Sequence, residues 1–347
     1  MAESKTDISD FLQKSMTWPI VDVRSPAEYS HGHIPGAANL PLFTNEERSI
    51  VGTLYLQKGS AEAMLKGLEM AGPKLKDYTM QAFRLAPAGE ILLYCWRGGM
   101  RSNSMAWLLN TAGMRALTLD GGYKAYRRII QAHFSQPYNL VVMGGMTGSG
   151  KTEILEEIEK SGHQVIHLER LASHKGSVFG HLGMPGQPTT EQFENDLFTV
   201  LRALDVRKPI FIEDESLAIG RIFIPRSFYS QMSTGLYISL LVPFAIRVKR
   251  LIETYTMTDK ELLIAGIRRI EKRLGTENAN LAIGSVMEGN MGKAVETVLC
   301  YYDKVYKRSM GLHQRRESME MTVSNDKPEE VAAKIQETVN KAVGCRL

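Results

Sequence analysis

The sequence has 347 residues, 44% of them hydrophobic and 23% charged, with a formal net charge of +4. This is too long for one typical hydrophobic core and suits two domains of ordinary size. The mild positive charge permits an anionic partner without requiring one. The apolar run around Leu236–Ile246 contains a proline and is far shorter than the roughly 20 residues that span a bilayer, so a membrane segment is excluded.

The three cysteines, Cys95, Cys300 and Cys345, form an odd and sparse set. Such a set is a poor disulfide framework and favours a reducing compartment. The N-terminal segment MAESKTDISD has no basic stretch followed by an apolar one, so it does not read as a signal peptide. We expect a cytoplasmic protein.

The first part of the chain alternates strand and helix patterns. Short apolar runs predict strands at residues 18–24 and 90–95 and a strand with its turn at 117–123, and helical spacing of apolar residues predicts a helix at 102–113. Strands that alternate with helices imply a parallel sheet covered on both faces. The polar, proline-containing segment at 133–139 marks a boundary, so we expect one α/β domain at residues 1–135 and a second at 136–347.

The strand–helix pattern restarts after this boundary. The sequence predicts a strand at 139–144, a glycine-rich loop, a helix at 152–162, and further strands at 164–169 and 209–216. From about Phe244 to the end the pattern is mostly helical. The fold class expected for the whole chain is therefore α/β in both domains, with a mostly helical C-terminal part.

The glycine-rich loop matches G-x-x-x-x-G-K-[ST] at every fixed position. Its glycines let successive backbone N–H groups face a phosphate, the following helix adds its positive N-terminus, and Lys151 neutralises a terminal phosphate while Thr152 can ligate Mg²⁺. An apolar strand before the loop and an amphipathic helix after it supply the context that the motif requires. The predicted phosphate-binding residues are Gly145, Thr147, Gly148, Ser149, Gly150, Lys151 and Thr152.

Three consecutive acids, Glu213, Asp214 and Glu215, end the strand predicted at 209–216. P-loop folds usually place an acid near the metal at such a strand end. A solvated acidic loop is the alternative, and the pattern does not assign a separate role to each acid.

Cys95 lies in a loop, CWRGGMRS, between a predicted strand and a predicted helix. In that position backbone N–H groups and the helix N-terminus point towards the sulfur, and Arg97 and Arg101 add positive charge. These effects favour the thiolate, which is the nucleophilic form. We therefore predict Cys95, Arg97 and Arg101 as catalytic residues, with a buried structural cysteine as the alternative.

Two chemistries use such a loop. Rhodanese-type sulfurtransferases carry a chalcogen on the cysteine, whereas phosphatases with C-x5-R loops form a phosphocysteine. The stretch from Asp22 to Asn39, with HGHIPGA at its centre, resembles the N-terminal signature of rhodanese domains, and the Gly121–Gly122 pair resembles their closing turn. The seven-residue spacing from Cys95 to Arg101 leans towards the phosphatases and Tyr94 leans away from them, so the loop by itself leaves the chemistry open.

A rhodanese-like domain followed by a P-loop domain resembles the tRNA 2-selenouridine synthases, and matching stretches run along nearly the whole chain. The resemblance implies a rhodanese-like parallel-sheet domain, a P-loop NTPase-like domain, and conversion of 2-thiouridine to 2-selenouridine at the wobble position of tRNA. It also implies selenophosphate and geranyl diphosphate as co-substrates, with Mg²⁺ as a possible ion and no tightly bound cofactor. The stretches that carry it are CWRGGMRS (95–102), GMTGSGKT (145–152), LERLASHKGSVFG (168–180), FEN (193–195), IEDESLAIG (212–220) and YYDKVY (301–306).

Two other functions remain open for this pairing of motifs: a P-loop kinase or NTPase with a regulatory rhodanese domain, and a persulfide carrier that delivers sulfur to a partner. The pattern leaves the oligomeric state open.

A basic stripe is the predicted RNA contact. Residues 244–275 hold eight basic and four acidic residues, and four of the basic ones form two i,i+4 pairs on one side of a helix. Such a stripe suits the phosphate backbone of RNA, although an ordinary solvated helix gives the same pattern. The four residues are Arg268, Arg269, Lys272 and Arg273.

Overall fold

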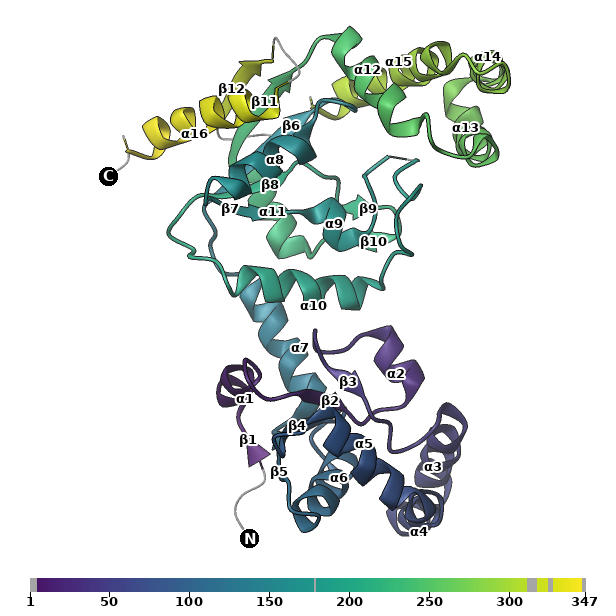
Figure 1. The fold of residues 1–347 in the computed structure, drawn as a ribbon, viewed down its shortest axis with the longest axis vertical. Helices are drawn as coiled ribbons and strands as arrows, with labels where there is room; N and C mark the ends of the chain where they lie inside the picture. The colour runs from purple at the N-terminus through teal and green to yellow at the C-terminus, as the bar shows by residue number, and fades with distance from the viewer. Residues whose placement is uncertain (1–4, 178, 311–316, 324–326, 345–347) are drawn as a thin grey trace. The chain divides into compact units, whose positions relative to one another are not determined.

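The computed structural model describes residues 5–177, 179–310, 317–323 and 327–344. Cys345 lies outside these residues. The chain divides into two compact units, the first comprising residues 1–133 with 194–199 and the second comprising 134–193 with 200–347. Each unit has a parallel β-sheet with helices packed on it (Figure 1), so the expected α/β fold class is confirmed.

The sheet of the first unit has the strand order β1-β5-β4-β2-β3, and all of its pairings are parallel. The central strand β4 is covered on both faces, so all of its residues after Glu90 are buried, and its sequence is a nearly continuous apolar run. The strands are β1 (Lys5–Thr6), β2 (Ile20–Asp22), β3 (Ala38–Asn39), β4 (Glu90–Tyr94) and β5 (Arg115–Leu119). The helices are α1 (Ile8–Lys14), α2 (Pro26–His31), α3 (Asn45–Lys58), α4 (Ser60–Ala71), α5 (Leu75–Leu85), α6 (Met100–Thr111) and α7 (Gly122–His133).

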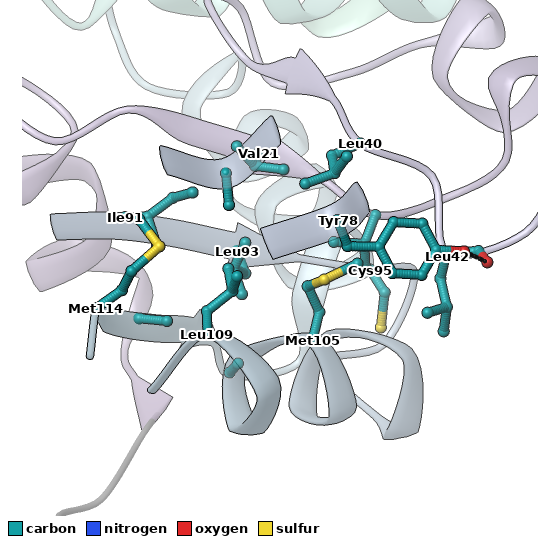
Figure 2. Packing of buried hydrophobic residues seen from close by; sticks show 14 of the residues in the cluster. Val21, Leu40, Leu42, Tyr78, Ile91, Leu93, Cys95, Met105, Leu109 and Met114 are labelled. Carbon is teal, nitrogen blue, oxygen red and sulfur yellow. Dashed lines mark hydrogen bonds between the residues drawn. The ribbon is translucent and has the colours of Figure 1, made fainter. Parts of the chain in front are cut away.

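The core of the first unit forms where β4 and β2 meet helices α5 and α6. Ile91 and Leu93 of β4 are fully buried, and they pack with Leu109 of α6 (Figure 2). Cys95 follows β4 directly and lies at one end of this core, beside Met105. The strand therefore delivers the cysteine to the carboxyl edge of the sheet, where α/β proteins place their sites.

The second unit has the strand order β12-β11-β6-β8-β7, again entirely parallel. The strands of this sheet are β6 (Leu140–Gly145), β7 (Gln164–Ile166), β8 (Ile210–Glu213), β11 (Leu236–Leu241) and β12 (Glu317–Thr322), and a separate hairpin is formed by β9 (Ala218–Ile219) and β10 (Ile222–Phe223). The helices are α8 (Lys151–Lys160), α9 (Leu168–Ala172), α11 (Arg226–Thr234), α12 (Phe244–Tyr255), α13 (Lys260–Leu274), α14 (Thr276–Met287), α15 (Met291–Met310) and α16 (Pro328–Gly344). Helix α10 (Thr190–Leu201) is shared, since its residues 194–199 belong to the first unit.

One expected strand is shorter than predicted, and one strand within the otherwise helical C-terminal part was not predicted. The strand predicted at 164–169 ends at Ile166, and Glu169 lies in the short helix α9. The mostly helical region after Phe244 contains the strand β12, which pairs with β11 along six residues. An edge strand close to the C-terminus is easily overlooked because its sequence, ESMEMT, has few β-branched residues.

Candidate active sites of the two units

The Cys95 loop is held in place by the start of helix α7. Tyr123 N donates to the Cys95 carbonyl over 2.9 Å, and Lys124 N donates to the Trp96 carbonyl over 3.0 Å. This close approach requires glycine at position 122, since a Cβ there would lie 2.3 Å from the Cys95 carbonyl oxygen. Gly122 also has a φ of 58°, which glycine adopts without strain. The closing turn and the cysteine loop therefore form one rigid backbone unit.

The sulfur of Cys95 accepts hydrogen bonds and is nearly closed off from solvent. Gly99 N and Ser102 Oγ each lie 3.3 Å from Sγ, and the residue is only 3% exposed. Burial raises the pKa of the Cys95 thiol, but the bonds from Ser102, the charge of Arg101 and the backbone amide of Arg97 outweigh it, so the pKa falls below its ordinary value. The loop is thus built to hold a thiolate, the form that attacks electrophiles.

The two arginines of the loop have different surroundings. Arg101 is mostly buried and binds both carboxylate oxygens of Glu28, with distances of 2.6 and 3.1 Å. Arg97 is exposed. Arg101 therefore contributes its charge from a fixed position, whereas the Arg97 side chain is accessible from solvent and only its backbone amide acts on Cys95. Sequence reasoning singled out neither Ser102 nor Glu28 as site residues, although both lie within motifs that it quoted.

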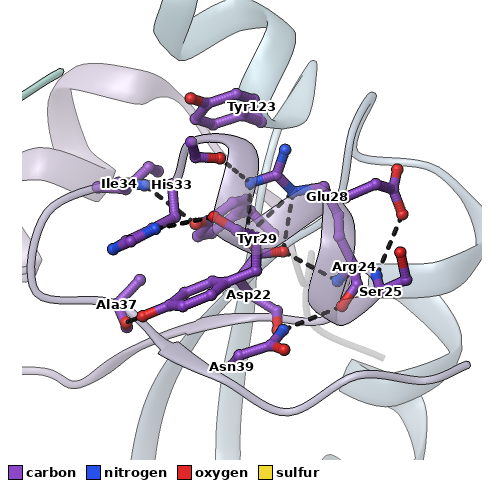
Figure 3. Close-up of polar contacts among 12 residues, drawn as sticks. Asp22, Arg24, Ser25, Glu28, Tyr29, His33, Ile34, Ala37, Asn39 and Tyr123 are labelled. Carbon is purple, nitrogen blue, oxygen red and sulfur yellow. Dashed lines mark hydrogen bonds and ion pairs between the residues drawn. The ribbon is translucent and has the colours of Figure 1, made fainter. Parts of the chain in front are cut away.

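A buried ion pair organises the loop that contains HGHIPGA. Arg24, 1% exposed, binds the Asp22 carboxylate and donates to the Gly32 carbonyl over 2.6 Å (Figure 3). Its guanidinium lies 4.0 Å from the centre of the Tyr123 ring, a cation–π contact. Asn39 donates to the backbone carbonyls of Asp22 and Arg24. The conspicuous residues of this segment thus position the backbone beside the Cys95 loop.

The P-loop of the second unit joins β6 to α8. Gly148 and Gly150 have φ values of 79° and 78°, which let the chain turn tightly into the helix. Lys151 Nζ donates to the Gly145 carbonyl over 3.1 Å, so the lysine folds back over its own loop. Ser149 Oγ is buried and has no hydrogen-bond partner in the part of the chain that the structure describes. These features match an anion-binding loop at a helix N-terminus.

Helix α12 supports the P-loop from the other side. Arg247, 4% exposed, makes a bidentate ion pair with Asp303 and donates to the Thr147 carbonyl over 3.2 Å. The guanidinium of Arg250 lies against Gly150, where a Cβ would approach it to 2.0 Å. Arg250 is therefore next to the phosphate-binding backbone, and sequence reasoning missed it because the two residues are far apart along the chain.

The three consecutive acids point in different directions. Glu213 is fully buried and accepts from the Leu168 backbone amide over 2.5 Å. Asp214 accepts from the Tyr237 hydroxyl over 3.1 Å. Burial and the charge of Glu169 raise the pKa of Glu215 above its ordinary value, and the Lys151 charge opposes this shift. Two of the three acids thus lie near the P-loop lysine, and the middle one is bonded elsewhere.

Glu169 completes this acidic group, and the sequence pattern did not single it out. Thr152 Oγ1 lies 3.3 Å from its carboxylate. Burial and the Glu169 charge raise the pKa of Glu213 to about 7, and burial also raises the pKa of Glu169. Glu213 Oε1 has no hydrogen-bond partner among the described residues.

The Mg²⁺ ion that this fold implies needs few protein ligands. Within residues 5–177, 179–310, 317–323 and 327–344, no group of three His, Cys, Asp or Glu side chains has an arrangement that holds a metal. A P-loop Mg²⁺ takes one or two protein oxygens and completes its shell with phosphate and water. Thr152 Oγ1, Glu169 and the unpartnered Glu213 oxygen supply hard oxygen donors of this kind, so the residues fit the ion.

The predicted basic stripe lies on α13. This helix buries Leu263, Ile267 and Ile270 on one face, so the opposite face is exposed to solvent. All four basic residues of the stripe are exposed: Arg268, Arg269, Lys272 and Arg273.

Among the helices in the described ranges, none is both long and apolar enough to cross a membrane.

Both units match known protein families. Residues 138–342, more than half of the chain, match the family model described as the tRNA 2-selenouridine synthase AAA domain. The chain belongs to the tRNA 2-selenouridine synthase family. Residues 7–129 match the model of the rhodanese-like domain, so the family expectation drawn from the motifs is confirmed.

Three relatives called tRNA 2-selenouridine synthase are each 38% identical to this chain. They come from Nitrosomonas europaea, Nitrosomonas eutropha and Bdellovibrio bacteriovorus, and the alignments cover 69%, 68% and 69% of this chain. They cover 64%, 63% and 65% of the relatives, so the chain matches somewhat less than two thirds of their length.

Proposed function

We propose that this protein replaces the sulfur of 2-thiouridine in tRNA with selenium at the wobble position of the anticodon. The family membership and the names of its relatives support tRNA and selenium as the substrate classes. The observation that carries the proposal is the Cys95 loop, in which hydrogen bonds from Gly99 and Ser102 favour an ionised sulfur. Such a loop suits the handling of a chalcogen.

The reaction proceeds in three steps in this proposal. The thiocarbonyl sulfur first attacks the carbon of geranyl diphosphate that carries the diphosphate group. A C–S bond forms, and diphosphate leaves. The selenium of selenophosphate then attacks C2 and geranylthiolate leaves. Water cleaves the Se–P bond to give 2-selenouridine and phosphate. Alkylation is needed because the unmodified sulfur is a poor leaving group.

The chain's own residues have separate tasks in these steps. The P-loop amides and Lys151 hold the diphosphate or selenophosphate, and a bound Mg²⁺ would neutralise part of the phosphate charge. The Cys95 loop, with Arg97 and Arg101, handles the chalcogen. The exposed basic stripe of α13 contacts the phosphate backbone of the tRNA, a contact that weakens as salt rises.

Nucleoside mass spectrometry tests the proposal. Thiolated tRNA is incubated with geranyl diphosphate, selenophosphate and the full-length protein, and both geranylated and selenated nucleosides are quantified. Cys95→Ser is expected to abolish 2-selenouridine, while Cys300→Ser, at an exposed cysteine, leaves it unchanged.

A second pair of variants tests the role of the P-loop separately from that of Cys95. Lys151→Ala weakens the binding of the anionic co-substrate, whereas Lys160→Ala, at the exposed end of the same helix, does not. Nucleotide turnover that is indifferent to Cys95→Ser, without any modified nucleoside, would instead identify a P-loop NTPase with a regulatory domain. A stable persulfide with unmodified tRNA would identify a sulfur carrier.

A further inference from the structure

The first unit contains an apolar cavity of about 1090 Å³ beside the Cys95 loop. Cavities that enclose small organic ligands have volumes of roughly 300–1,000 Å³, so this one is large enough for a ligand of that kind. One wall is the helical pair α3–α4, and the opposite wall is α6. The segment of α6 that flanks Ser102 lines it, with Met100 and Arg101 before Ser102 and Asn103 after it. The cavity therefore borders the segment of α6 that carries Ser102, whose hydroxyl donates to the sulfur.

The walls of the cavity are unusually apolar for a surface. Helix α3, every residue of which is described, has no buried side chain. Large apolar side chains from both walls remain exposed to the cavity. They include Tyr55, Leu56, Met64, Leu68, Met100 and Trp107. Contiguous exposed apolar surface of this extent marks a binding site.

The polar residues of the lining are concentrated where α2 and α3 approach the loop. Arg48 and Arg101 line the cavity, and both face Glu28, at 3.7 and 2.6 Å. Two guanidinium groups against one carboxylate leave a net positive charge at this rim. An apolar interior with a cationic rim fits a hydrocarbon chain attached to an anion.

A much smaller apolar cavity lies next to the phosphate-binding backbone of the P-loop unit. The apolar cavity that Thr147 lines there holds about 50 Å³, enough for only a few water molecules at roughly 15 Å³ each. A ten-carbon chain does not fit into it without rearrangement. The cavity of the first unit has room for such a chain.

We propose that the α3–α4–α6 cavity binds the geranyl chain of S-geranyl-2-thiouridine while C2 of that nucleoside faces the Cys95 loop. The RNA phosphates near the nucleoside meet the positive rim. This inference rests on the proposed function and assigns to the first unit a role that recognises the alkylated intermediate. The cavity thereby selects the uridine whose sulfur is ready to leave.

A binding assay with prepared RNA tests this without any turnover. Two anticodon stem–loop RNAs, one with S-geranyl-2-thiouridine and one with 2-thiouridine, are titrated with the full-length protein by fluorescence anisotropy. The wild type is expected to prefer the geranylated RNA by at least about tenfold, a small part of the gain from burying ten carbons.

Leu68→Asp places a carboxylate in the cavity wall and is expected to abolish this preference. The matched control is Leu65→Asp on the same helix α4. Leu65 is 64% exposed and Leu68 is 63% exposed, but only Leu68 lines the cavity. Ser104→Trp, at an exposed lining position of α6, fills the space without adding charge and gives the same loss.

Three outcomes would overturn the inference. One is equal binding of both RNAs by the wild type. Another is a raised KM for geranyl diphosphate in Leu68→Asp with the RNA preference intact, which would make the cavity a donor site. The third is a change of oligomeric state in Leu68→Asp, measured by sedimentation, with the preference intact. Failure of the proposed function gives a different result, because the wild type then yields no modified nucleoside in the turnover assay.

Discussion

Glu213→Gln is expected to stabilise the second unit at neutral and alkaline pH. Glu213 is fully buried, and its pKa of about 7 lies above its ordinary value of 4.5. A carboxyl whose pKa is raised by folding binds its proton more tightly in the native state than in the unfolded chain. The contribution of Glu213 to the free energy of unfolding is therefore fully present below pH 4.5, and this contribution is lost as the pH rises through about 7.

The size of this loss follows from the two pKa values. The difference between 4.5 and about 7 corresponds to about 3 kcal/mol once the group is ionised in both states. The glutamine amide of the variant cannot ionise, and its carbonyl oxygen can still accept from the Leu168 backbone amide. For a domain of this size, about 3 kcal/mol corresponds to a melting temperature that is roughly 6–12 °C higher at pH 8.

Thermal unfolding of both proteins at several pH values between about 4.5 and 8.5 measures the effect. The difference in stability between variant and wild type should grow with pH up to about 7 and then level off. Glu153→Gln is the control, because it removes an exposed carboxylate from the neighbouring helix α8. Parallel curves for wild type and Glu213→Gln over this range would refute the claim that burial of the Glu213 charge dominates.

Two further predictions concern the cysteine loop. Ser102→Ala removes a hydrogen bond to the sulfur, so the pKa of Cys95 rises and the pH midpoint of its alkylation by iodoacetamide moves up by about one pH unit; an unchanged midpoint would show that Ser102 does not support the thiolate. Gly122→Ala forces a Cβ to 2.3 Å from a backbone oxygen and should destabilise the first unit by more than about 3 kcal/mol in denaturant unfolding. Gly113→Ala, with a φ of 92° and open space around it, isolates the backbone strain of about 1 kcal/mol, and equal losses in both variants would contradict the steric argument.

The local geometry of both loops could be predicted because contiguous residues determine it. A strand, a short glycine-containing turn and a helix N-terminus produce the surroundings of Cys95, and the same sequence of elements produces the P-loop around Lys151. In both cases the amides that face the ligand belong to the motif itself. The motif residues therefore determine the backbone of both loops, whereas the side chains of Glu28, Glu169 and Arg250 reach the loops from other elements.

The residues that sequence reasoning missed come from tertiary packing. Glu169 reaches Thr152 because β7 ends early and α9 turns towards the P-loop. Arg250 reaches Gly150 from α12. The spacing of residues along the chain does not predict such contacts, because a carboxylate in a helix and an arginine in a basic segment are usually solvated.

The different directions of the three acidic side chains could have been predicted from the sequence. Side chains in an extended segment alternate between its two sides, so Glu213 and Glu215 share one direction and Asp214 takes the other. The structure has this arrangement. Asp214 accepts from the Tyr237 hydroxyl, and the charge of Lys151 acts on the pKa values of Glu213 and Glu215. Applying the period of two would have separated the middle acid from its neighbours.

Burial acts on both sites and has opposite results, and this difference is what the two chemistries need. At Cys95 the donors and the nearby Arg101 outweigh burial, so the sulfur is held as an anion. At Glu213 and Glu215 burial and the charge of Glu169 outweigh Lys151, so the pKa values of these carboxyls lie well above their ordinary range. A nucleophile must be charged before its substrate arrives, whereas carboxyls beside a phosphate loop must not repel the anion that the loop binds. Protonated carboxyls leave Lys151 and the loop amides as the dominant field, and a cation that binds there displaces the protons.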